Sequence, residues 1–346
     1  MSADELMLYE ALYRLASKGS EDGLFGTSAQ LAQGAFQRAS AGMPMPTIWF
    51  EVPLSGAPRF DLHVAHSNDD LHERAPYSSD FVDGHGELLN WYASEPRAGG
   101  GLALAYDVGD GRVDLPAVHV NVNDTSAFDA EGFFAHVGRP EATALYDAFA
   151  KRLPQGWRIW YFGVHPGRPG APVRIDCFVD GRVKRAYAAE PARFAEDLCK
   201  VGFDAEGSMA LRIGAEVAAS PFGMELQFDV LSDGGLGQTV GVSAQFSLAP
   251  ASKARTLWEP AGDAARLMEF AEETGAADAR WQHVRETMFT TAVRDGGVVR
   301  ALYCVPAFAK FRAHANAPLD AKVYLQAGAV NPSAFLQALA RSHCVE

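Results

Sequence analysis

Five stretches of the chain alternate strictly between apolar and polar residues, and this pattern predicts five β-hairpins separated by helical sequence. The clearest strands lie at 48–52, 118–122, 173–177, 226–230 and 321–325. One face of each strand is apolar, and the other carries Glu, His, Asn, Arg, Asp, Gln, Lys or Tyr. The full hairpins are expected at 47–54 with 59–66, 101–108 with 116–123, 157–165 with 172–179, 223–231 with 238–248, and 297–308 with 319–327.

Helical sequence flanks the hairpins. Ser2-Ala3-Asp4-Glu5 has the pattern of a capping box and predicts a helix that ends near Lys18. Further helices are expected at about 29–38, 87–93, 139–153, 181–200, 206–218, 252–274, 279–294 and 332–342. The sequence therefore predicts one α+β domain over 1–346, with a helical N-terminal segment (1–45), a β-barrel (46–330) and a C-terminal helix (331–346).

The two faces of the strands decide between a closed barrel and an open sheet. Amphipathic helices need an apolar sheet face to cover, so the polar face must line an interior or meet bulk water. An open ten-stranded sheet would expose two edges, and closure removes them. We expect a ten-stranded antiparallel barrel with helices outside and a polar lumen, which is wide enough to hold a ligand.

Alternation assigns a set of polar and aromatic side chains to this lumen. The inward residues with the clearest assignment are Trp49, Glu51, Arg59, Asp61, His63, His119, Asn121, Asn123, Arg174, Asp176, Phe178, Glu225, Gln227, Asp229, Ser243, Gln245, Lys322, Tyr324 and Gln326. On two strands whose pattern is ambiguous, Tyr161 and Tyr303 are the expected inward residues.

Composition and charge limit the possible functions. The chain is 48% hydrophobic with a formal net charge of −13 and no cluster of Lys and Arg, which argues against nucleic acid as a partner. Cys177, Cys199, Cys304 and Cys344 lack metal-ligand spacing, and no GxSxG elbow indicates a serine hydrolase. Neither a signal peptide nor a transmembrane run is apparent, so a soluble, cytoplasmic location is expected.

The predicted architecture resembles that of the ABBA prenyltransferases, in which five αββα units close a ten-stranded barrel around the reaction site. The resemblance covers the chain from about Thr47 to Val330, and two local sequence patterns support it. The strand containing Lys322 and Tyr324 is similar to the Lys/Arg-x-Tyr strand that holds and shields a prenyl diphosphate in that family. Glu51 lies where family members place the general base. Chain length and residue placement are most similar to the cyanobactin-type peptide prenyltransferases.

The resemblance implies roles for the lumen residues. It implies a dimethylallyl or geranyl diphosphate as the donor and an aromatic small molecule or peptide side chain as the acceptor, with Glu51 as the base. The implied diphosphate ligands are Arg59, His119, Arg174, Lys322 and Tyr324. The implied shield of the carbocation is Trp49, Tyr161, Tyr303 and Tyr324. Other expected lumen residues are His63, Asn121, Asp176, Gln227, Asp229, Gln245 and Gln326, with His63 and His119 able to relay protons.

Structural interpretations of the same residues remain open. Glu51 could pair with Arg59 across its hairpin, Arg174 with Asp176 could form an ion network, and Lys322 could protect an exposed edge. Trp49 could simply pack in the wall, and the histidines could be structural.

The acidic lumen leaves the ligand open as well. A Mg²⁺ ion could bridge its carboxylates to a diphosphate, with Asn68-Asp69-Asp70 as a weak further metal signal. The acidity of the lumen could also indicate that the acceptor is cationic, or that the protein retains the scaffold but has lost the activity. The alternative function is a non-catalytic barrel that binds a hydrophobic or peptide ligand.

Overall fold

The computed structural model describes residues 24–25, 34, 36, 47–66, 71–73, 75–80, 84–95, 101–109, 112–113, 115–122, 128–166, 168, 170–246, 248–295, 297–314, 318–330 and 332. The helices predicted at 2–18, 29–38 and 332–342 lie almost entirely outside these residues. Asn123, the Asn68-Asp69-Asp70 segment and Cys344 also lie outside them. The predicted domain boundaries therefore stay a prediction.

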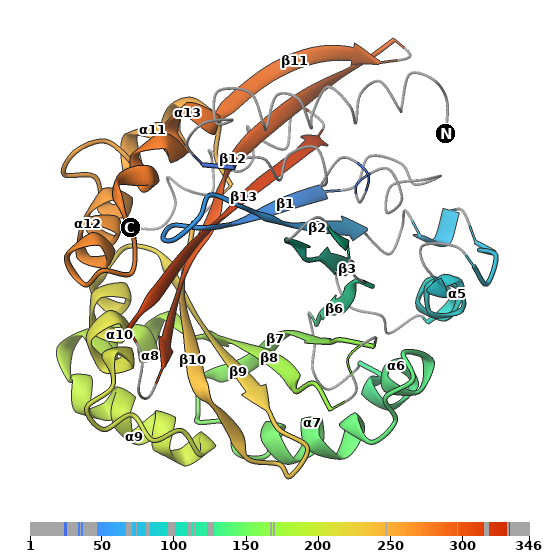
Figure 1. Cartoon of the computed structure of the whole chain (residues 1–346), viewed down its shortest axis with the longest axis horizontal. Helices are drawn as coiled ribbons and strands as arrows, with labels where there is room; N and C mark the ends of the chain where they lie inside the picture. Colours follow the sequence, from blue (N-terminus) through green and yellow to red (C-terminus); the bar gives the residue numbers. More distant parts are fainter. Residues whose placement is uncertain are drawn as a thin grey trace.

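Ten antiparallel strands close into a ring, as the sequence predicted (Figure 1). In ring order they are β10 (Leu236–Gln245), β9 (Gly223–Val230), β8 (Val173–Val179), β7 (Trp157–Val164), β6 (Ala117–Asn121), β3 (Gly101–Tyr106), β2 (Asp61–His66), β1 (Thr47–Pro53), β13 (Asp320–Val330) and β12 (Val298–His314). Pairing of β12 with β10, from Thr239 opposite His314 to Gln245 opposite Phe308, closes the ring. A two-stranded ribbon, β4 (Val108–Gly109) and β5 (Arg112–Val113), connects β3 to β6.

The apolar face of each strand points outward into a core beneath the helices. Ile48, Phe50 and Val52 of β1 are at most 1% exposed, and Leu226 and Phe228 of β9 are equally buried. Their polar neighbours in the sequence face the lumen. Burying the apolar set between the sheet and the helices is the main stabilising contribution expected for such a layered fold.

Helices surround the ring on its outer side (Figure 1). They are α5 (Gly86–Ser94), α6 (Ala130–His136), α7 (Ala142–Ala150), α8 (Gly181–Ala189), α9 (Pro191–Val201), α10 (Met209–Ala219), α11 (Ala251–Leu257), α12 (Asp263–Glu273), the 3₁₀ helix η2 (Ala279–His283) and α13 (Val284–Thr287). Within the described ranges, no helix combines the length and apolarity needed to cross a membrane.

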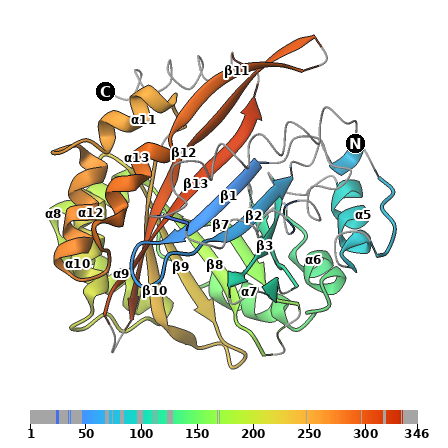
Figure 2. The ribbon, with the colours of Figure 1, turned by 45° about the horizontal axis from the view of Figure 1, so that its top comes forward.

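The helix predicted at 279–294 is wrong in its second half. Residues Phe289–Asp295 form an eleventh strand, β11, which pairs with the first half of β12 outside the ring (Figure 2). Its Phe-Thr-Thr-Ala-Val run has the β-branched composition of a strand, and Gly297 follows with a positive φ of 87°.

Two other helices are divided. The segment 181–200 separates into α8 and α9 where Pro191 starts a new helix, because proline is tolerated only in the first turn. The segment 252–274 separates into α11 and α12 around residues 258–262, which contain Pro260 and Gly262. Helix α6 was not predicted.

Candidate active site in the barrel lumen

A cavity of about 310 Å³ occupies the lumen. The residues that line it are Trp49, Glu51, His63, His119, Asn121, Trp160, Tyr161, Arg174, Asp176, Glu225, Gln227, Gln245, Phe246, Leu248, Ala307, Phe308, Lys310, Tyr324 and Gln326. Twelve of the sequence-predicted site residues are among them. Lys322 and Asp229 lie next to this set and contact it through ion pairs with Glu51 and Arg174.

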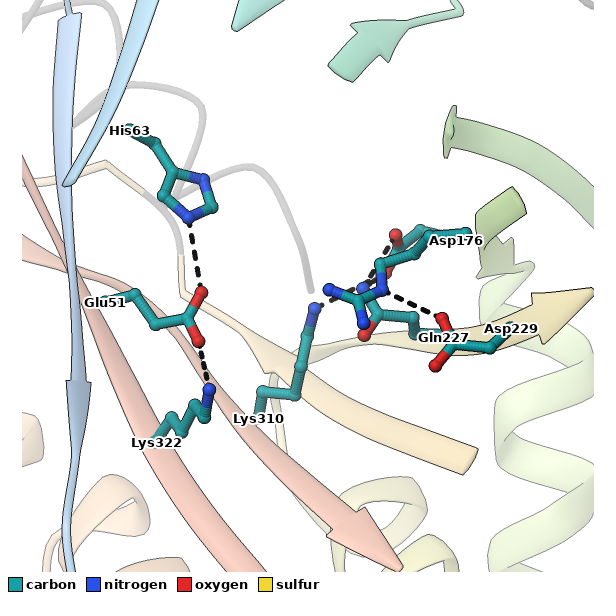
Figure 3. Close-up of polar contacts among 8 residues, drawn as sticks. Glu51, His63, Asp176, Gln227, Asp229, Lys310 and Lys322 are labelled. Atoms are coloured by element: carbon teal, nitrogen blue, oxygen red, sulfur yellow. Dashed lines mark hydrogen bonds and ion pairs between the residues drawn. The ribbon is translucent and has the colours of Figure 1, made fainter. Parts of the chain in front are cut away.

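Glu51 is the centre of a three-residue group formed by neighbouring strands (Figure 3). Lys322 Nζ on β13 contacts Glu51 Oε1, and His63 Nε2 on β2 lies 3.2 Å from Glu51 Oε2. Burial by itself would raise the pKa of Glu51, but the Lys322 charge and His63 outweigh burial and hold that pKa well below its usual value. Glu51 is therefore an ionised carboxylate inside the lumen. It does not pair with Arg59, and Lys322 lies between β1 and β12 rather than on an edge.

A second cluster of polar side chains lies across the lumen from Glu51 (Figure 3). Gln227 Nε2 on β9 donates to both oxygens of Asp176 on β8, at 3.0 and 2.9 Å. Lys310 Nζ on β12 lies 3.5 Å from Asp176 Oδ1. Arg174 Nε donates to Asp229 Oδ1 at 3.0 Å, as the direct pairing of these residues on β8 and β9 allows. Each of these lumen cations thus has its own carboxylate partner.

Glu225 adds a protonated carboxyl to this wall. It is 6% exposed on β9, opposite Phe178 of β8 and Ser243 of β10. Burial and the nearby Asp176 charge raise its pKa from 4.5 to about 8. At neutral pH Glu225 is therefore mostly uncharged, and this reduces the acidity that the sequence attributed to the lumen.

Aromatic side chains form the rest of the cavity wall. The rings of Phe308 and Tyr324 stack with centroids 4.0 Å apart, and Lys310 Nζ lies 5.3 Å from the Tyr324 centroid. Burial and the Glu51 charge raise the pKa of Tyr324 well above its usual value, so it stays a neutral phenol. The cavity therefore combines π-faces with cations and with the carboxylates of Glu51 and Asp176, each of which contacts a lysine.

Three stacked rings lead away from Glu51 along the wall. His63 stacks on His119 with centroids 5.8 Å apart, and His119 stacks on Tyr161 at 5.3 Å. Gly163 makes room for this stack, because a Cβ there would lie 2.3 Å from His119 Nδ1. Burial and the His63 charge hold the pKa of His119 well below its usual value, so His119 is neutral.

Two predicted positions differ from expectation. Arg59 was expected in the lumen but is exposed, because β2 begins only at Asp61 after the bend at 54–57 and Pro58. Tyr303 is 2% exposed and faces inward opposite Gly328, but it does not line the cavity and accepts a hydrogen bond from Gln326 Nε2 at 3.1 Å. Its ring fills the space over Gly328, where a Cβ would lie 3.1 Å from the Tyr303 hydroxyl.

Lys310, Phe308 and Trp160 were missed by sequence reasoning. The ninth barrel strand was expected to end at 308, but β12 continues to His314, and a bulge between Pro306 and Phe308 resets its alternation. A second bulge, between Ile159 and Tyr161, turns both Trp160 and Tyr161 toward the cavity. Pro306 inside an apolar run was the available signal, because strand prolines favour bulges.

A Mg²⁺ site does not emerge from the side chains alone. Among the residues described above, no group of three or more His, Cys, Asp or Glu is placed to hold a metal ion. Glu51, Asp176 and Asp229 each already contact a cation. These side chains therefore do not fit a preformed Mg²⁺ site.

Comparison with solved structures identifies the fold. AnaPT from Neosartorya fischeri aligns with a TM-score of 0.51 and 11% identity over 96% of this chain and 95% of its own. Two more distant matches are the 5-dimethylallyltryptophan synthase of Streptomyces coelicolor (TM-score 0.49, 14% identity, 94% and 97% coverage) and prenyltransferase PriB in complex with L-tryptophan and dimethylallyl thiolodiphosphate (0.46, 14%, 94% and 96%). No protein-family model and no curated protein matches the sequence.

The closed ten-stranded ring with helices outside is the ABBA, or PT-barrel, fold of the aromatic prenyltransferases. An identity of 11% establishes the architecture alone. The reaction must be argued from the lumen residues of this chain.

Proposed function

We propose that the protein is a prenyltransferase that moves a dimethylallyl or geranyl group from its diphosphate to an aromatic nucleophile. The observation that carries the proposal is the cavity itself, in which ionised Glu51 faces stacked Phe308 and Tyr324 beside lumen cations. The acceptor would be an aromatic small molecule or a peptide side chain. The peptide alternative rests on the expected resemblance in chain length and residue placement to cyanobactin-type enzymes.

Three cations are suited to receive the diphosphate. Lys310 and Lys322 lie directly opposite each other on β12 and β13, an arrangement of like charges that is unfavourable unless anions lie near them. Arg174 supplies a planar guanidinium suited to phosphate oxygens. Within the protein these cations pair with Asp176, Glu51 and Asp229. Donor binding would exchange these partners for diphosphate oxygens.

Ionisation of the donor breaks the allylic C–O bond and leaves the electron pair on the diphosphate. The developing negative charge would be stabilised by Arg174, Lys310 and Lys322. The allylic cation would lie against the faces of Phe308 and Tyr324, where a desolvated cation–π contact contributes about 2 kcal/mol. The acceptor carbon or heteroatom then attacks the cation, and the acceptor must lose a proton.

Glu51 is the candidate base for that proton, directly or through His63. Its pKa is low partly because the Lys322 charge stabilises the carboxylate. A diphosphate that takes Lys322 as a partner would remove this contribution and add a negative charge nearby. Both effects raise the pKa of Glu51 and strengthen it as a base after the donor has bound.

The proposal is tested by incubating the protein with dimethylallyl or geranyl diphosphate and indole-containing or phenolic acceptors. We expect prenylated product from the wild type. Glu51→Gln should retain donor binding, because Lys322 loses its carboxylate partner, and should lower the transfer rate by about 10²–10⁴-fold.

Glu206→Gln is the matched control, since Glu206 is an exposed glutamate outside the lumen. Normal transfer by Glu51→Gln would remove Glu51 from the mechanism. Tight donor binding without donor hydrolysis or transfer by the wild type would favour a non-catalytic binding barrel.

A further inference from the structure

A second cavity of about 180 Å³ adjoins the main one inside the barrel. Four residues, Trp49, Asn121, Tyr161 and Gln326, line both cavities and form a junction between them. The remaining residues that line the second cavity are Thr47, Ala65, His66, Gly101, Leu102 and Ala103. The lumen therefore offers a ligand two adjoining chambers rather than one.

Small residues create the space of the second chamber. Ala65 of β2 lies directly opposite Ala103 of β3, on the inward face, and Gly101 occupies the next inward position of β3. None of the described residues that line this chamber is Asp, Glu, Lys or Arg. Against the described lining, a carboxylate or ammonium group would lose water without gaining an Asp, Glu, Lys or Arg partner, which is strongly unfavourable.

Polar atoms at the junction are buried without a protein partner. Trp49 Nε1, Asn121 Oδ1 and the Tyr161 hydroxyl make no hydrogen bond within the described structure. Each unsatisfied buried group costs about 1–3 kcal/mol, and such groups are rare in folded proteins. The indole N–H donates, the amide oxygen accepts, and the phenol can do either. A ligand group that both accepts and donates would satisfy them, and an amide does so with its carbonyl and N–H.

We propose that the second chamber and its junction hold a neutral, amide-bearing portion of the acceptor, while the aromatic nucleophile occupies the main cavity beside Glu51. This inference rests on the proposed function only for the reaction in the main cavity. It restricts the acceptor class to aromatic residues whose amino and carboxyl groups are amidated, as in a peptide, and disfavours zwitterionic free amino acids. Binding at the junction can be measured without any prenyl transfer.

The test compares two probes that share an indole ring. N-acetyl-L-tryptophanamide has neutral amides, and L-tryptophan has charged termini. Equilibrium dialysis against the full chain should show at least about tenfold tighter binding of the amide. Trp49→Phe, Asn121→Leu and Tyr161→Phe should each reduce that preference by about three- to tenfold, the contribution of one hydrogen bond to a buried group.

Gln245→Leu is the control, because Gln245 lines only the main cavity and should change the binding of both probes by the same factor. Equal or tighter binding of L-tryptophan would overturn the inference, as would an amide preference that survives all three junction variants. Failure of both probes to bind would also overturn the inference, because water alone would then occupy the junction. Any of these results leaves the Glu51 test unaffected, and loss of transfer with an intact amide preference would overturn only the proposed reaction.

Discussion

Glu51 keeps its negative charge in a lumen where burial alone would neutralise it, because Lys322 and His63 contact its two oxygens. Glu225 is in the opposite protonation state. It lies near Asp176 without an ion-pair partner of its own in the described structure, and burial together with the Asp176 charge keeps it protonated. Two glutamates in one lumen therefore take different protonation states from their surroundings, a separation typical of sites that carry out proton chemistry.

The raised pKa of Glu225 has a consequence for stability. Between its usual value of 4.5 and about 8, folded Glu225 holds a proton that the unfolded chain has released. Folding then takes up a proton, so this residue's contribution becomes less favourable as pH rises through that window. Glu225→Gln removes the effect. Urea unfolding at pH 5, 6, 7 and 8 gives the free energy of unfolding of both proteins. The value for the variant should rise relative to that for the wild type by up to about 1.4 kcal/mol per pH unit.

Glu206→Gln, at an exposed position, is the control: its free energy of unfolding should differ from that of the wild type by the same amount at every pH. A pH-independent difference for Glu225→Gln would show that Glu225 ionises normally in the folded protein.

At the scale of elements, bulges in β7 and β12 decide which side chains enter the site. Without the bulge between Pro306 and Phe308, the inward set from Tyr303 and Val305 would continue to Ala307 and Ala309. With it, Phe308 and Lys310 face the cavity. The inserted residue thus adds an aromatic ring and a cation to the cavity wall, which Ala307 in the bulge also lines. A bulge beside a functional site commonly redirects side chains in this way.

Lys310 should consequently contribute to anion binding. Lys310→Met alone would leave Asp176 buried without its cation, so the informative variant is Lys310→Met combined with Asp176→Asn, compared with Asp176→Asn alone. Calorimetric titration with inorganic pyrophosphate should show about 10- to 100-fold weaker binding upon loss of Lys310, the contribution of a hydrogen bond to a charged group.

Lys151→Met, at the exposed end of α7, should bind pyrophosphate like the wild type. Equal affinities in the presence and absence of Lys310 would exclude this lysine from the donor site.

At the scale of the whole molecule, the net charge of −13 would oppose the approach of the proposed anionic donor. Three lumen cations are each paired with a carboxylate, so the lumen itself presents little net positive charge before a ligand arrives. Long-range repulsion should therefore dominate the approach at low ionic strength, where the Debye length is about 30 Å at 0.01 M.

The association rate of a prenyl diphosphate should accordingly rise as salt increases from about 10 to 100 mM, by up to about tenfold. Stopped-flow measurement of donor binding at constant pH checks this, with a neutral acceptor as the salt-insensitive control. A rate that falls steeply with salt would mean that the lumen cations attract the donor over a long range despite their paired carboxylates.

The barrel was predictable from local patterns. The period-two alternation of strands such as 48–52 and 226–230 fixes which face is apolar, and ten such strands with helices between them have few ways to bury that face without exposed edges. Glu51, His63, Arg174 and Tyr324 were placed in the lumen by the same alternation and do line the cavity. Their catalytic roles stay predictions.

Alternation failed where the backbone departs from a regular strand. Arg59 lies before β2 begins, so counting residues by twos placed it wrongly in the lumen. Lys310 lies beyond a bulge and past the predicted end of its strand, so it was missed. Ion pairing was also beyond local sequence, because Glu51 and Lys322 are 271 residues apart and meet only where β13 joins β1.

The sequence by itself thus determined the two faces of the sheet, since side-chain direction in a strand depends only on neighbouring residues. Only the tertiary structure decided the charge state of the lumen, because burial and long-range contacts determine which carboxylates are paired and which are protonated. The same holds for the second chamber, whose junction combines Trp49 of β1, Asn121 of β6 and Tyr161 of β7 through closure of the barrel.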